Sequence, residues 1–296
     1  MAVLWLVALI LALAPGAALL WYIRRMDKYE PEPWNMIGLA FFAGCLSVIP
    51  ALIIETALSG VHIGGFLGTV FIAFVVAAAT EEASKGALTY GFMWQKPAFN
   101  EIMDGVVYFG VGHMGFAVTE NLKYVFIESG GNVVQGLMNA FVRSTTAVPL
   151  HVIVGMIMGY HMGMARYART PQERIKNYLQ AFAWPVLLHG FYDLAAFSRN
   201  AKVQDVSSLM EVGFGSALMY AAVVALWLVL LPRIKQAQEL SFFKPHEAPT
   251  MPVAPTGCPN CGSAYPLGAN YCQNCAAPVA QQQQQQVYYQ QAPGGQ

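Results

Sequence analysis

The sequence has few charged residues for its length. Aspartate, glutamate, lysine and arginine make up 11% of its 296 residues, and 56% are hydrophobic, whereas an average soluble domain is about 25% charged. The 16 basic residues equal the 16 acidic ones, so the formal net charge is zero and no basic surplus favours nucleic acid as a partner. This composition excludes an ordinary soluble domain and indicates a chain that lies largely in lipid.

Cysteine is also scarce, and the five cysteines fall in two settings. Cys45 lies in an apolar run, where we expect a small core residue. The other four form the pattern C-x2-C-x10-C-x2-C near the C-terminus: Cys258, Cys261, Cys272 and Cys275. Two short-spaced pairs suit tetrahedral zinc, so we predict a structural Zn²⁺ held by all four thiolates. A ribbon this short has almost no core, and zinc would therefore supply its folding energy.

A basic segment is missing before the first apolar run, where a cleaved signal peptide would have one. The Ala-x-Ala site in this run, at Ala12 and Ala14, is followed directly by Pro15. We therefore expect an uncleaved helix over residues 2–23 with a kink at Pro15.

Seven apolar runs approach the roughly 20 residues that a helix needs to cross a bilayer. The predicted spans are 2–23, 36–58, 66–94, 104–126, 133–165, 178–197 and 209–231. Because 133–165 is too long for one simple span, we expect its first part to lie near the interface or to re-enter the membrane. The predicted fold is an all-α polytopic membrane protein with about seven transmembrane helices and a small cytoplasmic zinc ribbon of four cysteines.

The chain divides by composition into four segments. Residues 1–235 form the predicted seven-span domain, and 236–257 form a Pro-rich linker, which we expect to be flexible. Residues 258–280 hold the ribbon cysteines, and the Gln-rich tail 281–296 is expected to be disordered.

Basic residues choose between the two orientations of such a bundle. With the N-terminus outside, three lie on outer loops: Lys123, Arg199 and Lys202. Ten then lie on inner loops: Arg24, Arg25, Lys28, Lys96, Arg166, Arg169, Arg174, Lys176, Arg233 and Lys235. We therefore predict a multi-pass cell-membrane protein with its N-terminus outside and its C-terminus in the cytoplasm. That compartment is reducing, which argues against disulfides between the four ribbon cysteines.

The third span places three charges between apolar flanks: Glu81, Glu82 and Lys85. Each costs about 2.5–3.5 kcal/mol at the centre of a membrane helix. Glu81 and Lys85 are four residues apart with the acid first, which favours a helical ion pair. Glu82 points about 100° away around the helix, and we expect it to have no partner within the segment. Such intramembrane carboxylates indicate a functional site.

Other spans also contain costly polar residues: Glu120, Arg143, His151, and the pair His189 and Asp193 four residues apart on one helix face. Four helices could thus direct acids and imidazoles into one cavity. One use is a site that activates water, in which a carboxylate is the base and the other groups hold a metal or stabilise an oxyanion. Another is a proton or ion path. A third interpretation is a purely structural hydrogen-bond network.

Two further histidines, His113 and His161, stand singly on apolar faces. For these we favour a structural role over a catalytic one.

Three motifs in one order resemble those of the PrsW-type intramembrane proteases. They are Glu81-Glu82-x-x-Lys85, Phe116-x-x-x-Glu120-Asn121 and His189-Gly-x-x-Asp193. The segment DKYEPEP after the first span, Asp104-Gly105, and Arg143 followed by His151 are also similar to that family, which itself resembles the CAAX prenyl endopeptidases. The resemblance covers about residues 1–235 and implies hydrolysis of peptide bonds in the membrane. In the best-known members the substrate is a membrane-anchored anti-sigma factor.

The resemblance also implies roles for individual residues. Glu81 would be the general base, with Glu82 supporting it. The remaining catalytic candidates would coordinate a metal or position water and oxyanion: Glu120, His151, His189 and Asp193, with Lys85 and Arg143 in support. A catalytic Zn²⁺ would take its ligands from Glu120, His151 and His189. The sequence has no HExxH helix, so a zincin-type site is excluded.

The sequence thus predicts an intramembrane endopeptidase that acts on membrane-anchored proteins, with glutamate-activated water and a metal. The alternatives are a catalytically silent membrane scaffold and a proton-coupled transporter. The expected partners are the lipid bilayer, a membrane-anchored protein substrate and a cytoplasmic protein that binds the ribbon.

Overall fold

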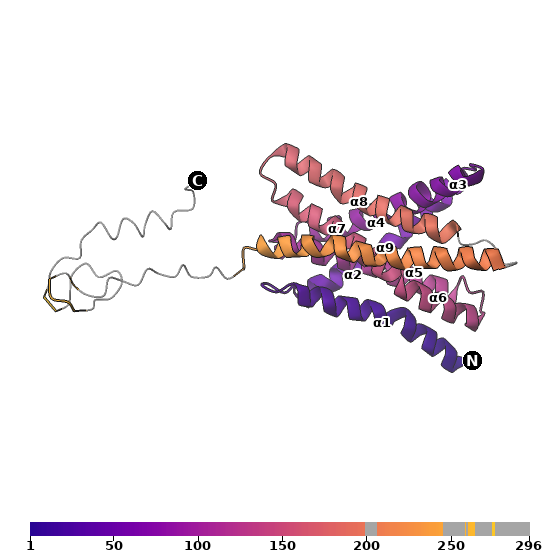
Figure 1. The fold of residues 1–296 in the computed structure, drawn as a ribbon, viewed down its shortest axis with the longest axis horizontal. Coiled ribbons are helices and arrows are strands. Elements are labelled where there is room, and N and C mark those ends of the chain that lie inside the picture. Colours follow the sequence, from indigo (N-terminus) through magenta and orange to yellow (C-terminus); the bar gives the residue numbers. More distant parts are fainter. Residues whose placement is uncertain (199–205, 245–257, 259, 264–273, 276–296) are drawn as a thin grey trace. The chain divides into compact units, whose positions relative to one another are not determined.

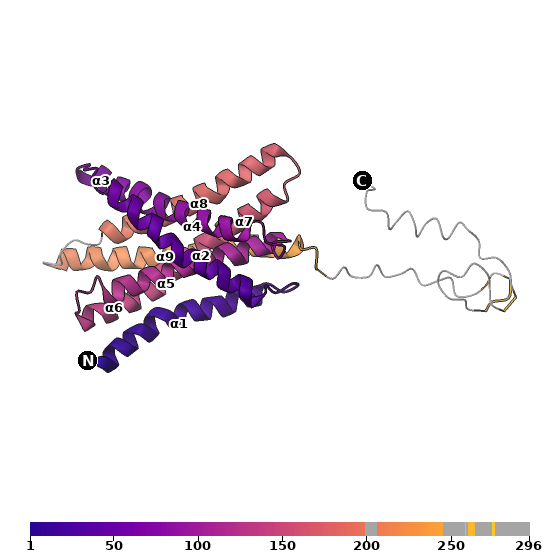
Figure 2. The ribbon, with the colours of Figure 1, turned by 180° about the vertical axis from the view of Figure 1, so that it is seen from behind.

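The computed structural model describes residues 1–198, 206–244, 258, 260–263 and 274–275. The chain falls into two compact units, Met1–Lys244 and Pro245–Gln296. The first unit is a bundle of long helices, which Figures 1 and 2 show from opposite sides. The described residues contain no β-strand. The predicted all-α architecture is therefore confirmed, and the predicted tail 281–296 lies outside the described residues.

The first unit contains nine α-helices and one π-helical segment in its described part. They are α1 (Ala2–Met26), α2 (Trp34–Leu58), α3 (Gly65–Phe71), η1 (Ile72–Ala79), α4 (Thr80–Met93), α5 (Ile102–Phe126), α6 (Val133–Thr145), α7 (Ala147–Arg166), α8 (Pro171–Ser198) and α9 (Val206–Glu239). Because α9 continues to Glu239 and the unit to Lys244, the first residues of the predicted linker belong to the helical bundle.

Five helical segments among the described residues are long and apolar enough to cross a membrane. They are Ala2–Met26, Trp34–Leu58, Gly65–Met93, Ile102–Phe126 and Val133–Arg166. These match the first five predicted spans and make the chain a polytopic membrane protein. The sixth and seventh predicted spans fall on α8 and α9, which are helical but do not belong to those five. Their crossing of the membrane stays a prediction.

Helices α5 and α7 form the buried centre of the bundle, and glycines let their backbones meet. A side chain on Gly159 would come within 1.9 Å of the Gly105 carbonyl oxygen. Similarly, α2 approaches α5 so closely that a side chain on Gly44 would meet the Gly112 carbonyl at 1.7 Å. Close packing over small residues is a usual way for helices to associate in lipid. It brings α2, α5 and α7 together around the polar residues described below.

Pro15 lies inside α1, as expected. A proline has no N–H to give to the carbonyl four residues back, so the Leu11 carbonyl loses its helical partner. The Ser144 hydroxyl donates to that carbonyl at 2.6 Å, and the Asn121 amide donates to the Ala12 carbonyl at 3.1 Å. Neighbouring helices thus satisfy the interrupted backbone, as they must in lipid. The same contacts fasten α5, next to Glu120, against α1.

Two predicted spans are interrupted. In the third, eight residues form the π-helical segment η1, and the Thr80 hydroxyl donates five residues back to the Val75 carbonyl at 3.3 Å. Such π-helical insertions are frequent at functional sites, and this one ends immediately before Thr80 and Glu81. The long region 133–165 breaks at Thr146 into α6 and α7. Whether α6 lies at the interface or re-enters the membrane stays a prediction.

Candidate active site

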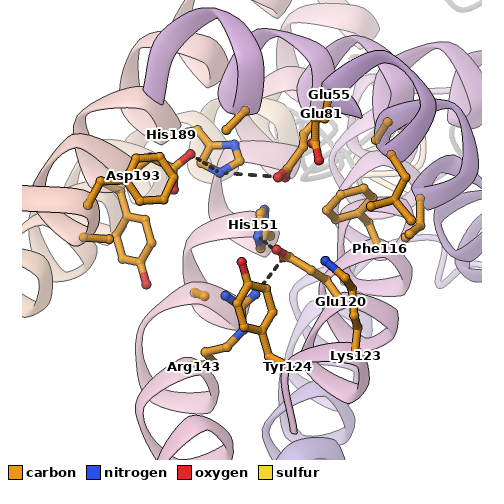
Figure 3. Close-up of a pocket in the computed structure, with 18 of the residues that line it drawn as sticks. Glu55, Glu81, Phe116, Glu120, Lys123, Tyr124, Arg143, His151, His189 and Asp193 are labelled. Atoms are coloured by element: carbon orange, nitrogen blue, oxygen red, sulfur yellow. Dashed lines mark hydrogen bonds and ion pairs between the residues drawn. The ribbon is translucent and has the colours of Figure 1, made fainter. Parts of the chain in front are cut away.

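A cavity of about 780 Å³ opens between the helices of the first unit. Its walls come from α2, η1, α4, α5, α6, α7 and α8. It is lined by most of the polar residues predicted within the spans: Glu81, Glu120, Arg143, His151, His189 and Asp193. Figure 3 shows these side chains converging from separate helices. The structure therefore brings together residues that lie more than 100 positions apart in the sequence.

Glu81 occupies the first turn of α4, where η1 ends, and it lines the cavity. Glu81 is only 7% exposed. The Lys85 ammonium lies 3.2 Å from Glu81 Oε2, which confirms the predicted ion pair. His189 Nε2 lies 3.8 Å from the same oxygen. Glu81 is thus a carboxylate at the cavity wall with a cation on one side and an imidazole on the other.

Glu82 lies behind Glu81 and is fully buried. The expectation that it has no partner within its segment is wrong, because Lys85 Nζ lies 2.6 Å from Glu82 Oε1. Residues three apart on a helix also meet, and the lysine reaches both acids. His113 Nε2 and His189 Nδ1 each approach Glu82 at 2.9 Å. Glu82 therefore orients the lysine and two histidines and does not face the cavity.

Lys85 is fully buried between these acids and His151. Its ammonium lies 3.1 Å from His151 Nδ1 and 4.4 Å from the centre of the Phe116 ring. Because an ammonium can only donate, His151 Nδ1 must accept. The proton of the neutral imidazole then sits on Nε2, which donates to Glu120 Oε2 at 3.2 Å. Lys85 thus fixes the tautomer of His151.

His189 directs its two ring nitrogens at different carboxylates. Its Nδ1 donates to Glu82 Oε1 at 2.9 Å. Its Nε2 lies 3.3 Å from Asp193 Oδ2 and 3.8 Å from Glu81 Oε2. The His151 and His189 rings meet edge to face with centroids 4.8 Å apart. A carboxylate–imidazole pair of this kind typically orients a metal-binding or proton-accepting histidine.

Glu120 pairs with Arg143 across the cavity. Arg143 Nη2 lies 2.7 Å from Glu120 Oε2, and its guanidinium stacks 4.0 Å over the Tyr124 ring. Figure 3 shows Glu120 between His151 and Arg143. Arg143 therefore compensates the Glu120 charge and holds α6 against α5.

A compact set of potential metal donors lines the cavity. Glu81, His151 and His189 each offer one atom, and the three atoms lie within 4.8 Å of one another. One carboxylate and two imidazoles are a donor set that zinc accepts in hydrolytic enzymes. The family resemblance implied Glu120 with the two histidines as metal ligands. In the structure Glu81 completes the compact group, whereas Glu120 is paired with Arg143.

Sequence reasoning overlooked several residues of the cavity wall, notably Glu55, Lys123 and Tyr192. Glu55 is the one acid in the predicted span 36–58, so its cost in lipid was an available signal. Tyr192 carried no such signal, because its role depends on a 2.8 Å contact between its hydroxyl and that of Thr146.

His113 and His161 lie away from the cavity lining, as their expected structural role requires. His113 also bonds the Phe109 carbonyl at 2.8 Å, in addition to its contact with Glu82. His161 is buried on α7, with its Nδ1 3.4 Å from Asn177 Oδ1. Of the two, His113 is the one that contacts a residue next to the cavity, the Glu82 carboxylate.

The second unit contains the cysteine cluster. The sulfurs of Cys258, Cys261 and Cys275 lie within 4.8 Å of one another. Asn260 Nδ2 donates to Cys275 Sγ at 3.6 Å, and Asn274 Nδ2 donates to Cys261 Sγ at 3.8 Å. Cys272 lies outside the described residues. Three of the four predicted ligands thus converge, and side-chain amides are placed to stabilise thiolates.

The polytopic helical bundle encloses carboxylates, imidazoles and buried cations around one cavity, and such intramembrane charges mark a functional site. Comparison with known proteins gives the family. The family model "PrsW family intramembrane metalloprotease" matches residues 32–230. The chain therefore belongs to the PrsW family and is a multi-pass membrane peptide hydrolase.

The sequence is similar to several proteins named Protease PrsW. It is 34% identical to that of Bacillus subtilis over 181 residues, which are 61% of this chain and 78% of the relative. It is 31% identical to that of Geobacillus kaustophilus over 237 residues, 80% and 93% of the two chains. It is 32% identical to that of Oceanobacillus iheyensis over 228 residues, 77% and 94%. No solved structure matches the chain significantly.

Proposed function

We propose that this chain is an endopeptidase that cleaves a membrane-anchored protein inside the cavity, with Glu81 as the general base. The observation that carries the proposal is the position of Glu81: at the cavity wall, 3.2 Å from a buried ammonium, with His189 beside it. The family resemblance implies substrates of the anti-sigma-factor type. The bilayer and a membrane-embedded protein substrate follow from the family itself.

The residues support a division of labour. Glu81 takes a proton from water as the water oxygen attacks the scissile carbonyl carbon, and it returns that proton to the departing amine. Glu82 is buried behind it and keeps Lys85 and His189 in place. Lys85 compensates the two carboxylates. Asp193, Glu120 and Arg143 also line the cavity. The two carboxylates would position water, and the Arg143 guanidinium would stabilise the developing oxyanion.

A catalytic metal fits the same cavity. His151 and His189 are its candidate ligands, and the Glu120 carboxylate would complete three protein donors with one open position, which leaves Glu81 as the base. His189 would bind the metal through Nε2, which contacts only carboxylates. His151 would first release one of its two hydrogen bonds, to Lys85 or to Glu120. When bound, Zn²⁺ would polarise the water and the substrate carbonyl.

Proteolysis by purified protein in liposomes tests this function. A single-span substrate should yield two fragments, whose ends mass spectrometry identifies. Protein that is folded but cleaves nothing would favour the scaffold, and proton flux without cleavage would favour the transporter.

We also propose that the N-terminus is outside and the C-terminus cytoplasmic, because ten basic residues then lie toward the inner side of the predicted spans and three toward the outer side. A reporter fused after Lys235 should be active only in the cytoplasm, and one placed in the loop 199–205 only outside. An external reporter after Lys235 would contradict both the orientation and the argument against disulfides.

The cysteine cluster is proposed to be a structural zinc ribbon that binds a cytoplasmic protein. Four thiolates leave no open position on the metal, so its role is structural. The convergence of Cys258, Cys261 and Cys275 supports this assignment. The predicted linker would let the ribbon fold separately from the bundle.

Replacing Cys258 and Cys261 by serine should release one equivalent of zinc and unfold the ribbon, while cleavage of a minimal substrate continues. Metal content by atomic emission and the liposome assay measure the two effects. Cys45→Ser, a matched change in the bundle, should retain the ribbon zinc. If cleavage of the minimal substrate disappears together with the ribbon zinc, the ribbon belongs to the enzyme and the proposed division into domains is incorrect.

A further inference from the structure

A second group of acids lies away from the cavity, where two loops and the end of α9 meet. The segment DKYEPEP between α1 and α2 contributes Asp27, Glu30 and Glu32, and the start of α5 contributes Glu101 and Asp104. The end of α9 joins them, because Gln238 Nε2 donates to the Met26 carbonyl at 2.6 Å and the Ser241 hydroxyl donates to Glu101. Figures 1 and 2 show the end of α9 beside the end of α1. We call these five acids the acidic cluster.

Hydrogen bonds connect the acidic cluster into one unit. The Glu32 backbone N–H donates to Asp27 Oδ2 at 3.1 Å. The backbone N–H groups of Asn100 and Glu101 donate to Asp104 Oδ2 at 2.5 and 2.6 Å. The Asn100 side chain donates to Glu30 Oε1 at 3.2 Å, and the Tyr108 hydroxyl donates to Glu32 Oε2. Each of these hydrogen bonds is accepted by one oxygen of a carboxylate, and the second oxygen of that carboxylate does not take part in it.

The remaining oxygens are buried and receive no donor from the described residues. They are Asp27 Oδ1, Glu30 Oε2, Glu32 Oε1, Asn100 Oδ1 and Asp104 Oδ1. The residues Asp27, Glu32 and Asp104 are only 2%, 3% and 0% exposed. None of the ion pairs formed within the described part of the chain includes a member of the acidic cluster. Five buried acceptors in these adjoining segments thus have no ion pair to compensate them.

Such a group requires compensation, because an unpaired buried carboxylate is strongly unfavourable. One proton shared between Glu32 and Asp104 would satisfy two oxygens. The unpaired oxygens of Asp27 and Glu30 would remain without a donor. The amide oxygen of Asn100 would also remain, because an amide is not protonated at neutral pH.

We propose that the acidic cluster binds one hydrated divalent cation of the Mg²⁺ type. Carboxylate and amide oxygens are the ligands that Mg²⁺ and Ca²⁺ prefer, and the absence of imidazole and thiolate from the cluster disfavours zinc. No three acids of the cluster bring their donor atoms within 4.8 Å of one another, as Glu81, His151 and His189 do, so one or two carboxylates would bind the ion directly and waters would fill the other positions. A looser set suits Mg²⁺, which keeps several of its waters. The ion would tie the α1–α2 loop, the start of α5 and the end of α9 together.

Equilibrium dialysis of the full-length protein in detergent micelles tests the proposal directly. Protein freed of loosely bound divalent ions is dialysed against MgCl₂ or CaCl₂, and bound metal is measured by atomic emission. We expect one saturable equivalent per chain at millimolar Mg²⁺, with the zinc content unchanged. Competition between MgCl₂ and CaCl₂ shows which ion the acidic cluster prefers, and saturable binding of either ion supports it. If the wild-type protein binds neither ion, the proposal is overturned and shared protons compensate the acids.

Isosteric variants locate the bound ion. Glu32→Gln and Asp27→Asn should each weaken binding by about 10–100-fold, as loss of a ligand or its support does at other metal sites. Both residues lie in the α1–α2 loop, and the test needs only one of the two variants to fold. Glu239→Gln is the matched control, because it removes a carboxylate that is 54% exposed near the same helix end. It should bind as wild type does. Wild-type affinity in both loop variants would place the ion elsewhere and contradict the assignment.

Discussion

Glu81→Gln is expected to lower peptide-bond hydrolysis by about 10²–10⁴-fold, the usual loss when a general base is removed. The amide keeps the size of the side chain at the cavity wall but cannot take a proton from water. The amount of folded protein should be maintained, because a neutral amide in a membrane bundle costs less than a carboxylate. Liposome cleavage rates, normalised to folded protein, measure the effect.

Glu55→Gln provides the matched control for this variant. Glu55 lines the same cavity and undergoes the same chemical change, but it does not belong to the compact donor group of Glu81, His151 and His189. We expect a far smaller loss of rate. His189→Ala and Asp193→Ala should also abolish cleavage, and combining either with Glu81→Gln should add little, because residues that act as one unit lose function non-additively. Cleavage at the wild-type rate by the Glu81→Gln protein would refute the mechanism.

The parts of the site that sequence could predict are those fixed by local cost or spacing. Glu81, Glu82 and Lys85 were conspicuous because charge in an apolar run is expensive wherever the helix packs. The four-residue spacing predicted the Glu81–Lys85 pair, which the structure confirms at 3.2 Å. The cysteine pairs were equally visible, because each needs only a short turn to aim two thiolates at one ion.

The parts of the site that could not be predicted from the sequence are contacts between residues of different helices. Glu82 gains His113 and His189 from α5 and α8, residues 31 and 107 positions away. The acidic cluster was not predicted, because its members come from segments far apart in the chain: Glu30 meets Asn100 across 70 positions. Likewise, apolar composition does not distinguish a π-helical turn from an α-helical one, so η1 was read as ordinary helix. Hydropathy finds the spans, but tertiary packing decides which polar groups meet.

The variant Lys85→Ala is expected to reduce the amount of folded protein as well as activity. Lys85 is fully buried and lies 3.2 and 2.6 Å from the two carboxylates. Its removal leaves Glu81 and Glu82 buried without their cation and frees the acceptor nitrogen of His151. Breaking a buried ion pair in this way costs about 3–5 kcal/mol, a large share of the roughly 5–15 kcal/mol that stabilises a typical protein. Thermal unfolding in detergent and the yield of monodisperse protein measure the loss.

Two further variants identify the cause of that loss. Lys123→Ala is the matched control: this lysine also lines the cavity, but its side chain is 33% exposed and its pair with Glu128 is solvated. Its removal should change stability little, because exposed ion pairs contribute about 0–1 kcal/mol. The double variant Lys85→Met with Glu82→Gln removes the fully buried carboxylate together with the cation. It should therefore recover much of the yield without recovering cleavage. Normal folding of Lys85→Ala would show that the buried charges are compensated by something other than this lysine.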